Sequence, residues 1–163
     1  IFLIGRHNRS KLNLYRYNHF HLLYDIKMEF EKKRKIGILG GGQLGRLLIQ
    51  YGLSKFSCEV LILSPDLKQG CGPYHNFGID VNVIEGSLMD KDVLRSFCIG
   101  LDVVTIEIEH VNVEALLEIS QEYPDIKFIP SLKTIQTIQD KYHQKQHYKK
   151  NMIPTLDFTS YTS

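Results

Sequence analysis

Residues 36–46, IGILGGGQLGR, join a short apolar run to a glycine-rich turn. Gly40, Gly42 and Gly45 fit the spacing G-x-G-x-x-G. In this pattern the first glycine permits a tight turn, the second lets the backbone approach a ligand closely, and the third lets a helix pack against a strand. The stretch therefore predicts a strand, a turn and a helix whose first amide groups attract an anion such as a phosphate.

Short apolar runs and helical patterns alternate along the chain after this turn. We expect strands at residues 36–39, 60–63, 81–84, 103–108 and 127–129. Between them, apolar side chains at helical spacing predict inward faces formed by Leu44, Leu47, Leu48 and Tyr51, by Val93, Leu94, Phe97 and Cys98, and by Leu116 and Leu117. This alternation is typical of the α/β class, here a Rossmann-like, doubly wound parallel sheet whose strands end along one ligand-binding edge.

Two glutamates stand at the expected end of the fourth strand, in the stretch TIEIEHV at residues 105–111. Side chains alternate along a strand, so Glu107 and Glu109 would share one face. There they could accept strong hydrogen bonds from ribose hydroxyls or from an amine. The alternative is that both are solvated residues where the strand ends, or that Glu109 helps to begin the next helix.

The glycine spacing also leaves a nicotinamide cofactor open as the ligand. That function needs an acidic residue about 20 residues further on, at the end of the second strand, to bind ribose hydroxyls. Asp66 follows Ser64 and Pro65 near that place. An NAD(P)-binding Rossmann domain of an oxidoreductase is therefore an alternative, as is a glycine turn that serves only the fold.

Composition excludes several other classes of function. The 163 residues carry a net charge of +2, and residues 36–163 contain eleven Lys/Arg against fifteen Asp/Glu, so no basic stripe indicates nucleic-acid binding. Nothing approaches the apolar run of about 20 residues that a membrane span needs. The three cysteines include no C-x-x-C pair, which is typical of free thiols in a reducing compartment. We therefore expect a cytoplasmic protein without nucleic-acid or membrane partners.

Both ends of the chain differ from its centre. Residues 1–27 are rich in Tyr, His and Asn without periodicity, so we assign residues 1–34 to an unassigned leader and expect the natural start at Met28. After Pro130, residues 131–151 predict one or two polar helices, and MIPTLDF at 152–158 predicts the entry to a strand. The last part has no core of its own, so we expect that it is the truncated start of a second domain.

The stretch HQKQH places His143 and His147 one helical turn apart, a spacing that could ligate a metal. Gln144 stands where a zinc protease would have a glutamate, and no third ligand is apparent. A solvated helix face is therefore the favoured interpretation, and we expect no metal site in this chain.

Three stretches in this order resemble one family: KIGILGGGQLGRLL at 35–48, DVVTIEIEHVNVEALLE at 102–118, and IPSLKTIQTIQDKYHQKQHYKKNMIPTLDF at 129–158. Together they are similar to the N-terminal part of the 5-(carboxyamino)imidazole ribonucleotide synthases, the PurK-type enzymes of the ATP-grasp superfamily. The resemblance implies that residues 35–139 form a pre-ATP-grasp domain and that residues 140–163 begin an ATP-grasp domain. It also implies a ribonucleotide ligand in place of a nicotinamide cofactor.

Enzymes of this family are ligases of purine (IMP) biosynthesis. They use ATP and bicarbonate to convert 5-aminoimidazole ribonucleotide to 5-carboxyaminoimidazole ribonucleotide, with release of ADP and phosphate. The resemblance implies that the substrate-binding residues are Gly42, Gln43, Leu44, Glu107 and Glu109. In the sequence QDK it also implies that Lys141 meets the ATP phosphates.

The resemblance places the remaining machinery beyond Ser163. The catalytic residues and the Mg²⁺ ligands of the family lie in that region, so we expect this chain to be inactive alone and the full-length protein to be a homodimer that uses ATP and Mg²⁺. The stretch DLKQGCGPYHNFGID at residues 66–80 departs from the Pro/Ala-rich loop of the family, and we assign no site there.

Overall fold

The computed structural model describes residues 33–66 and 80–159. Within them, five strands form one parallel sheet in the order β3-β2-β1-β4-β5. The strands are β1 (Arg34–Leu39), β2 (Cys58–Ser64), β3 (Asp80–Glu85), β4 (Val103–Ile106) and β5 (Lys127–Ile129). The predicted α/β class and the Rossmann-like parallel sheet are confirmed.

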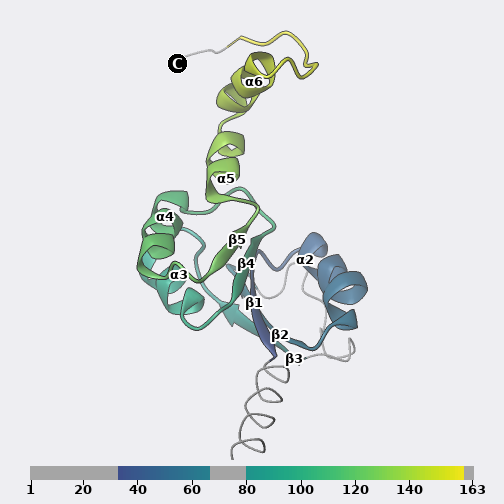
Figure 1. Ribbon diagram of the computed structural model, residues 1–163, viewed down its shortest axis with the longest axis vertical. Helices are drawn as coiled ribbons and strands as arrows, with labels where there is room; N and C mark the ends of the chain where they lie inside the picture. The colour runs from purple at the N-terminus through teal and green to yellow at the C-terminus, as the bar shows by residue number, and fades with distance from the viewer. Residues whose placement is uncertain (1–32, 67–79, 160–163) are drawn as a thin grey trace, which may run out of the picture. The chain divides into compact units, whose positions relative to one another are not determined.

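The helices follow the strands as expected of a doubly wound fold. They are α2 (Gln43–Leu47), the π-helical turn η1 (Leu48–Gly52), the 3₁₀ turn η2 (Leu53–Lys55), α3 (Lys91–Cys98), α4 (Val113–Glu122), α5 (Leu132–Gln139) and α6 (Lys141–Lys150). In Figure 1, α3 and α4 cover one face of the sheet and α2 covers the other. The polar segment after Pro130 forms two helices, α5 and α6.

Each face of the sheet carries its own apolar cluster, because successive side chains of a strand point to opposite sides. In β1, Leu39 belongs to the cluster that also contains side chains of α3 and α4, whereas Ile38 belongs to the cluster that contains Ile49 of η1. The predicted inward face of α3 is confirmed, since Leu94 and Cys98 are fully buried. Burial raises the pKa of the Cys98 thiol to about 12, so this cysteine is a core residue and no nucleophile at neutral pH.

The helix after the glycine turn presents another face to the sheet than its apolar spacing predicts. The four residues expected to face inward are Leu44, Leu47, Leu48 and Tyr51, but Leu44 and Tyr51 are each 62% exposed. Gly45 and Ile49 are the buried positions. The cause is steric: Gly45 lies so close to the Gly40 carbonyl that only a glycine fits, which fixes the inward face. The prediction was wrong for Leu44, Leu47 and Tyr51, whereas Leu48 is half-buried and packs against the cluster that contains Ile49.

Other differences from the sequence-based expectations concern the end of β4, the segment after α6 and the start of β1. β4 ends at Ile106, two residues earlier than expected, so Glu107 and Glu109 lie beyond the strand. Residues 152–158 form neither strand nor helix. β1 already begins at Arg34, inside the segment assigned to the leader. Met28, Cys71 and the loop at 67–79 lie outside the described residues.

Four helices begin at a side chain that accepts a backbone N–H bond. Asp90, Asn112, Ser131 and Asp140 accept from amides in the first turns of α3, α4, α5 and α6. α2 begins at Gly42, which offers no such acceptor. The first turn of α2 therefore differs from the first turns of the other α-helices in lacking a side-chain cap.

No helix among the described residues is long and apolar enough to cross a membrane.

Candidate functional site

The turn after β1 requires glycine at two of the three motif positions. Gly40 has φ +108°, a backbone conformation that favours glycine, and a Cβ there would lie 3.1 Å from Cγ2 of Ile108. A Cβ on Gly45 would lie 2.9 Å from the carbonyl oxygen of Gly40. The Gly40 N–H also donates to the Leu63 carbonyl at 2.9 Å, which fastens the turn to the end of β2. The tight turn and the close helix packing expected of these glycines are both present.

The middle glycine faces open space instead of protein. A Cβ added to Gly42 would meet no atom within 4 Å, and its φ of −76° suits any residue. The fold itself therefore does not demand a glycine at this position. The carbonyl of Gly42 accepts the helical hydrogen bond of the Arg46 N–H at 3.2 Å. The amides of Gln43 and Leu44, which precede that bond, lie in the first turn, where a helix supplies no carbonyl partner.

The glycine turn forms one wall of a hollow at the carboxyl ends of β1, β2 and β4. β1 lies between β2 and β4, so this is the point where the order of the sheet reverses and where ligands bind in such folds. The hollow has a volume of about 390 Å³. We call it the glycine-turn pocket, and it is lined by Gly40, Gly41, Gly42, Gln43, Leu44, Gly45, Ser64, Pro65, Asp66, Leu88, Glu107 and Ile108.

Four of the five residues predicted to bind substrate line this pocket: Gly42, Gln43, Leu44 and Glu107. Glu107 is held there although β4 has ended, because its N–H donates to the Leu39 carbonyl at 3.0 Å and continues the pairing with β1. The Thr105 hydroxyl donates to Oε1 of Glu107 at 3.1 Å. The strand end and this hydrogen bond together orient the half-buried Glu107 carboxylate.

Glu109 does not line the glycine-turn pocket. The expectation that it shares a face with Glu107 assumed a strand up to Ile108, and that strand ends earlier. Glu109 is exposed, and its carbonyl accepts a hydrogen bond from Nε2 of Gln139 at 2.8 Å. The structure thus supports the alternative of a solvated residue after the strand for Glu109 alone.

The segment after β2 contributes pocket residues that the sequence left without a substrate role. The Ser64 hydroxyl is buried and donates to the Asp66 carbonyl at 3.0 Å, which folds Pro65 and Asp66 around the strand end. Asp66, considered only for a nicotinamide cofactor, lies in the same pocket as Glu107. Its position directly after an apolar strand was the available signal, because strand ends meet at one edge of a parallel sheet.

The groups in the pocket suit a ligand that has an anionic group, hydrogen-bond donors and an apolar ring. First-turn amides at the glycine turn favour an anion. The carboxylate of Glu107 accepts hydrogen bonds from hydroxyl or amine groups. Leu44 and Ile108 line the pocket with exposed apolar side chains, whose area a flat ring can cover. A phosphorylated sugar that carries a small ring combines all three.

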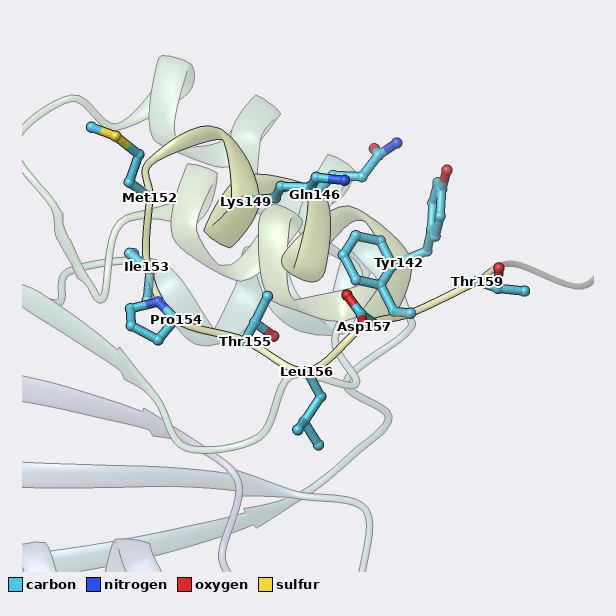
Figure 2. A pocket seen from close by; sticks show the side chains of 11 residues that line it. Tyr142, Gln146, Lys149, Met152, Ile153, Pro154, Thr155, Leu156, Asp157 and Thr159 are labelled. Atoms are coloured by element: carbon cyan, nitrogen blue, oxygen red, sulfur yellow. The ribbon is translucent and has the colours of Figure 1, made fainter.

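A second hollow, of about 630 Å³, lies between α6 and the segment that follows it. Figure 2 shows Tyr142, Gln146 and Lys149 projecting from the helix beside that segment. The Tyr142 and Phe158 rings meet edge to face with centroids 5.6 Å apart. Lys141, predicted to meet ATP, is the exposed first residue of α6 and does not line this hollow.

Metal-ligating side chains do not gather into a metal site in the part of the chain that the structure describes. Residues 33–66 and 80–159 contain no group of three or more His, Cys, Asp or Glu side chains that could hold a metal ion. His143 has Asp140 as a neighbour, with Nδ1 and Oδ2 4.0 Å apart. His147 is exposed on the same helix. Although the two histidines lie one helical turn apart, they do not belong to a group of three potential metal ligands among the described residues.

Comparison with known proteins finds a matching domain family. The ribonucleotide synthetase preATP-grasp domain matches residues 33–139. Phosphoribosylaminoimidazole carboxylase of Candida glabrata is 39% identical over 124 residues, which make up 76% of this chain and 21% of that protein. The chain therefore spans about a fifth of the length of this relative.

Two solved structures share both fold and sequence with the chain. N5-carboxyaminoimidazole ribonucleotide synthetase from Thermotoga maritima has a TM-score of 0.63 and 34% identity, and the match covers 76% of this chain and 32% of that one. N5-carboxyaminoimidazole synthase from Aspergillus clavatus, in complex with ADP and 5-aminoimidazole ribonucleotide, has a TM-score of 0.58 and 36% identity, and the match covers 78% and 32%. The chain spans about a third of each.

Proposed function

Because the chain belongs to the ribonucleotide synthetase preATP-grasp domain family, we propose that its glycine-turn pocket binds 5-aminoimidazole ribonucleotide. The chain is homologous to the N-terminal domain of the N5-carboxyaminoimidazole ribonucleotide synthases of purine biosynthesis. The proposed activity is that of a protein in which this domain is joined to an ATP-grasp region. That protein would convert the ribonucleotide, bicarbonate and ATP to 5-carboxyaminoimidazole ribonucleotide, ADP and phosphate.

One observation carries the proposal: the glycine turn and Glu107 line the same pocket at the reversal point of the sheet. In the proposed complex the phosphate lies against the amides of Gln43 and Leu44, with Gly42 leaving room for it. Glu107 accepts hydrogen bonds from ribose hydroxyls or from the amine. The relative from Aspergillus clavatus that was solved with this ribonucleotide supports the choice of ligand.

The other parts of the proposal concern regions next to this pocket. We assign residues 35–139 to ribonucleotide binding and residues 140–163 to the start of an ATP-grasp region, with Lys141 as a cation for the ATP phosphates. Relatives solved with ADP support ATP as the second ligand. Mg²⁺, a homodimer and a cytoplasmic location remain predictions from the family resemblance. We propose no contact between Glu109 and the substrate, because Glu109 lies outside the pocket.

A chimera tests the proposed activity directly. Residues 33–140 of this chain are joined to the corresponding remainder of the Thermotoga maritima relative, and release of ADP is measured. We expect hydrolysis of ATP that depends on both 5-aminoimidazole ribonucleotide and bicarbonate, since the substrate domain determines which acceptor is carboxylated. A folded chimera whose ATP hydrolysis is indifferent to the ribonucleotide would overturn the proposal.

Thr105 is predicted to position the Glu107 carboxylate without touching the ligand. Thr105→Val removes the hydroxyl that donates to Oε1 of Glu107 and keeps the shape of the side chain. A hydrogen bond to a charged group contributes about 1.5–3 kcal/mol, and only part of this affects binding because Thr105 acts through Glu107, so we expect ribonucleotide affinity to fall about 2- to 10-fold by calorimetry. Thr105→Ser should restore the affinity. An unchanged affinity in Thr105→Val would show that Glu107 is oriented by the backbone alone.

A further inference from the structure

A groove between α5 and α6 shares no residue with the glycine-turn pocket. Its volume is about 330 Å³, within the range of small-ligand sites. It is lined by Lys133, Gln136, Thr137, His143, Gln146, His147 and Lys150. Every one of these side chains can donate a hydrogen bond, and the lining contains no carboxylate.

The groove is built from one face of each helix. On α5 the lining residues are spaced three and four apart, and on α6 they follow the spacing i, i+3, i+4 and i+7, so each set lies on a single helix face. Lys133 stands near the start of α5, and Lys150 is the last residue of α6. The two lysines therefore bring fixed positive charge from both helices into one groove.

Helix electrostatics explains only part of this charge. A helix C-terminus favours cations, which accounts for Lys150 and His147 in the last turn of α6. The same rule predicts no cation at the start of α5, where Lys133 lies, or at His143 in the first turn of α6. Asp140 is the acid beside His143, at 4.0 Å, and its Oδ1 is engaged in capping α6 through the His143 N–H at 2.9 Å.

We propose that this groove, the α5–α6 groove, binds a compact multivalent phosphate anion of the oligophosphate type. A divalent metal ion is disfavoured because two lysine ammonium groups line the groove beside the histidines. Every lining residue except Thr137 is exposed, so a single ion contact contributes little. A chain of linked phosphates carries more charge and more acceptor oxygens along the groove than a single phosphate, so it gains more from contacts with both helices.

The test titrates the chain with inorganic tripolyphosphate in 50 mM NaCl and compares two double variants. Lys133→Gln with Lys150→Gln removes the fixed charge of the groove. Lys55→Gln with Lys127→Gln removes the same charge from exposed lysines outside the groove and outside the glycine-turn pocket. We expect the groove variant to bind at least tenfold more weakly and the control variant to bind within twofold of the original chain.

Three further measurements test whether the binding is specific for linked phosphates: titration with orthophosphate, titration at higher salt, and titration with oligoglutamate. Orthophosphate should bind at least tenfold more weakly than tripolyphosphate, and 300 mM NaCl should weaken the binding of both, because exposed charges are screened. The proposal is overturned if tripolyphosphate fails to bind at millimolar concentration, if both double variants weaken it equally, or if oligoglutamate of similar charge binds as well. Circular dichroism checks that both variants fold. The glycine-turn pocket is intact in both, so this result does not depend on ribonucleotide binding.

Discussion

Glu107→Gln is expected to weaken binding of 5-aminoimidazole ribonucleotide about 10- to 100-fold. The change keeps the size of the side chain and removes the charge that strengthens its hydrogen bonds to ribose hydroxyls or to the amine. A hydrogen bond to a charged group contributes about 1.5–3 kcal/mol, and about 1.4 kcal/mol corresponds to a tenfold change in affinity. Isothermal titration of the chain with the ribonucleotide measures the loss.

Glu109→Gln is the matched control for this experiment. It removes the same charge two residues away, from an exposed side chain outside the glycine-turn pocket. We expect its affinity to stay within twofold of the original. Equal losses in the two variants would mean that the ribonucleotide is attracted by the general charge of the segment, and a larger loss in Glu109→Gln would contradict the placement of the ligand.

Gly45→Ser is expected to lower the free energy of unfolding by about 1–3 kcal/mol, the range seen when atoms are forced into well-packed sites. A Cβ at this position would lie 2.9 Å from the Gly40 carbonyl oxygen, a backbone atom that cannot turn aside. The helix must then move away from the strand, and the glycine turn with it. Urea denaturation followed by circular dichroism measures the change.

Gly42→Ser separates binding from folding. A Cβ there meets nothing within 4 Å, and serine is a favoured residue at a helix start, so we expect a stability within about 1 kcal/mol of the original. The added side chain enters the space that we assign to the phosphate, so ribonucleotide affinity should fall at least tenfold. Normal affinity in Gly42→Ser would show that the phosphate does not approach this glycine.

Much of the fold follows from the sequence because its strongest signals are local. The predicted strands that became β1 and β2 are apolar runs that the sheet buries, and the glycine spacing required a turn between strand and helix. Leu94, Phe97 and Cys98 carried the period of α3 clearly enough to predict its buried face. The place of Glu107 near a ligand edge also followed, because the carboxyl ends of parallel strands share one edge.

The features that the sequence could not predict depend on contacts between distant segments. The inward face of α2 is set by Gly45 against Gly40, whereas the apolar spacing of Leu44 and Tyr51 indicates another face. The position where β4 ends depends on its pairing with β1 and β5. Because β4 ends at Ile106, Glu107 lines the glycine-turn pocket and Glu109 lies outside it. The apolar spacing of residues 103–108 continues past Ile106, so it does not reveal that β4 ends there.

The position of Asp66 also suits a nicotinamide cofactor as the ligand. It lies in the glycine-turn pocket after β2, where a nicotinamide-binding domain uses an acid to bind ribose hydroxyls. A ribonucleotide offers hydroxyls as well, so the position of Asp66 suits both ligands. The two differ in the adenosine and nicotinamide groups, which a direct comparison of binding detects.

Paired calorimetric titration of the chain with 5-aminoimidazole ribonucleotide and with NADH tests which of the two ligands the glycine-turn pocket binds. Both ligands contain phosphate and ribose, so a difference in their affinities shows which of the remaining groups the glycine-turn pocket recognises. We predict saturable binding of the ribonucleotide, weakened about 10- to 100-fold in Glu107→Gln, and at least a hundredfold weaker binding of NADH. Tight binding of NADH with no binding of the ribonucleotide would overturn the proposed function of this pocket.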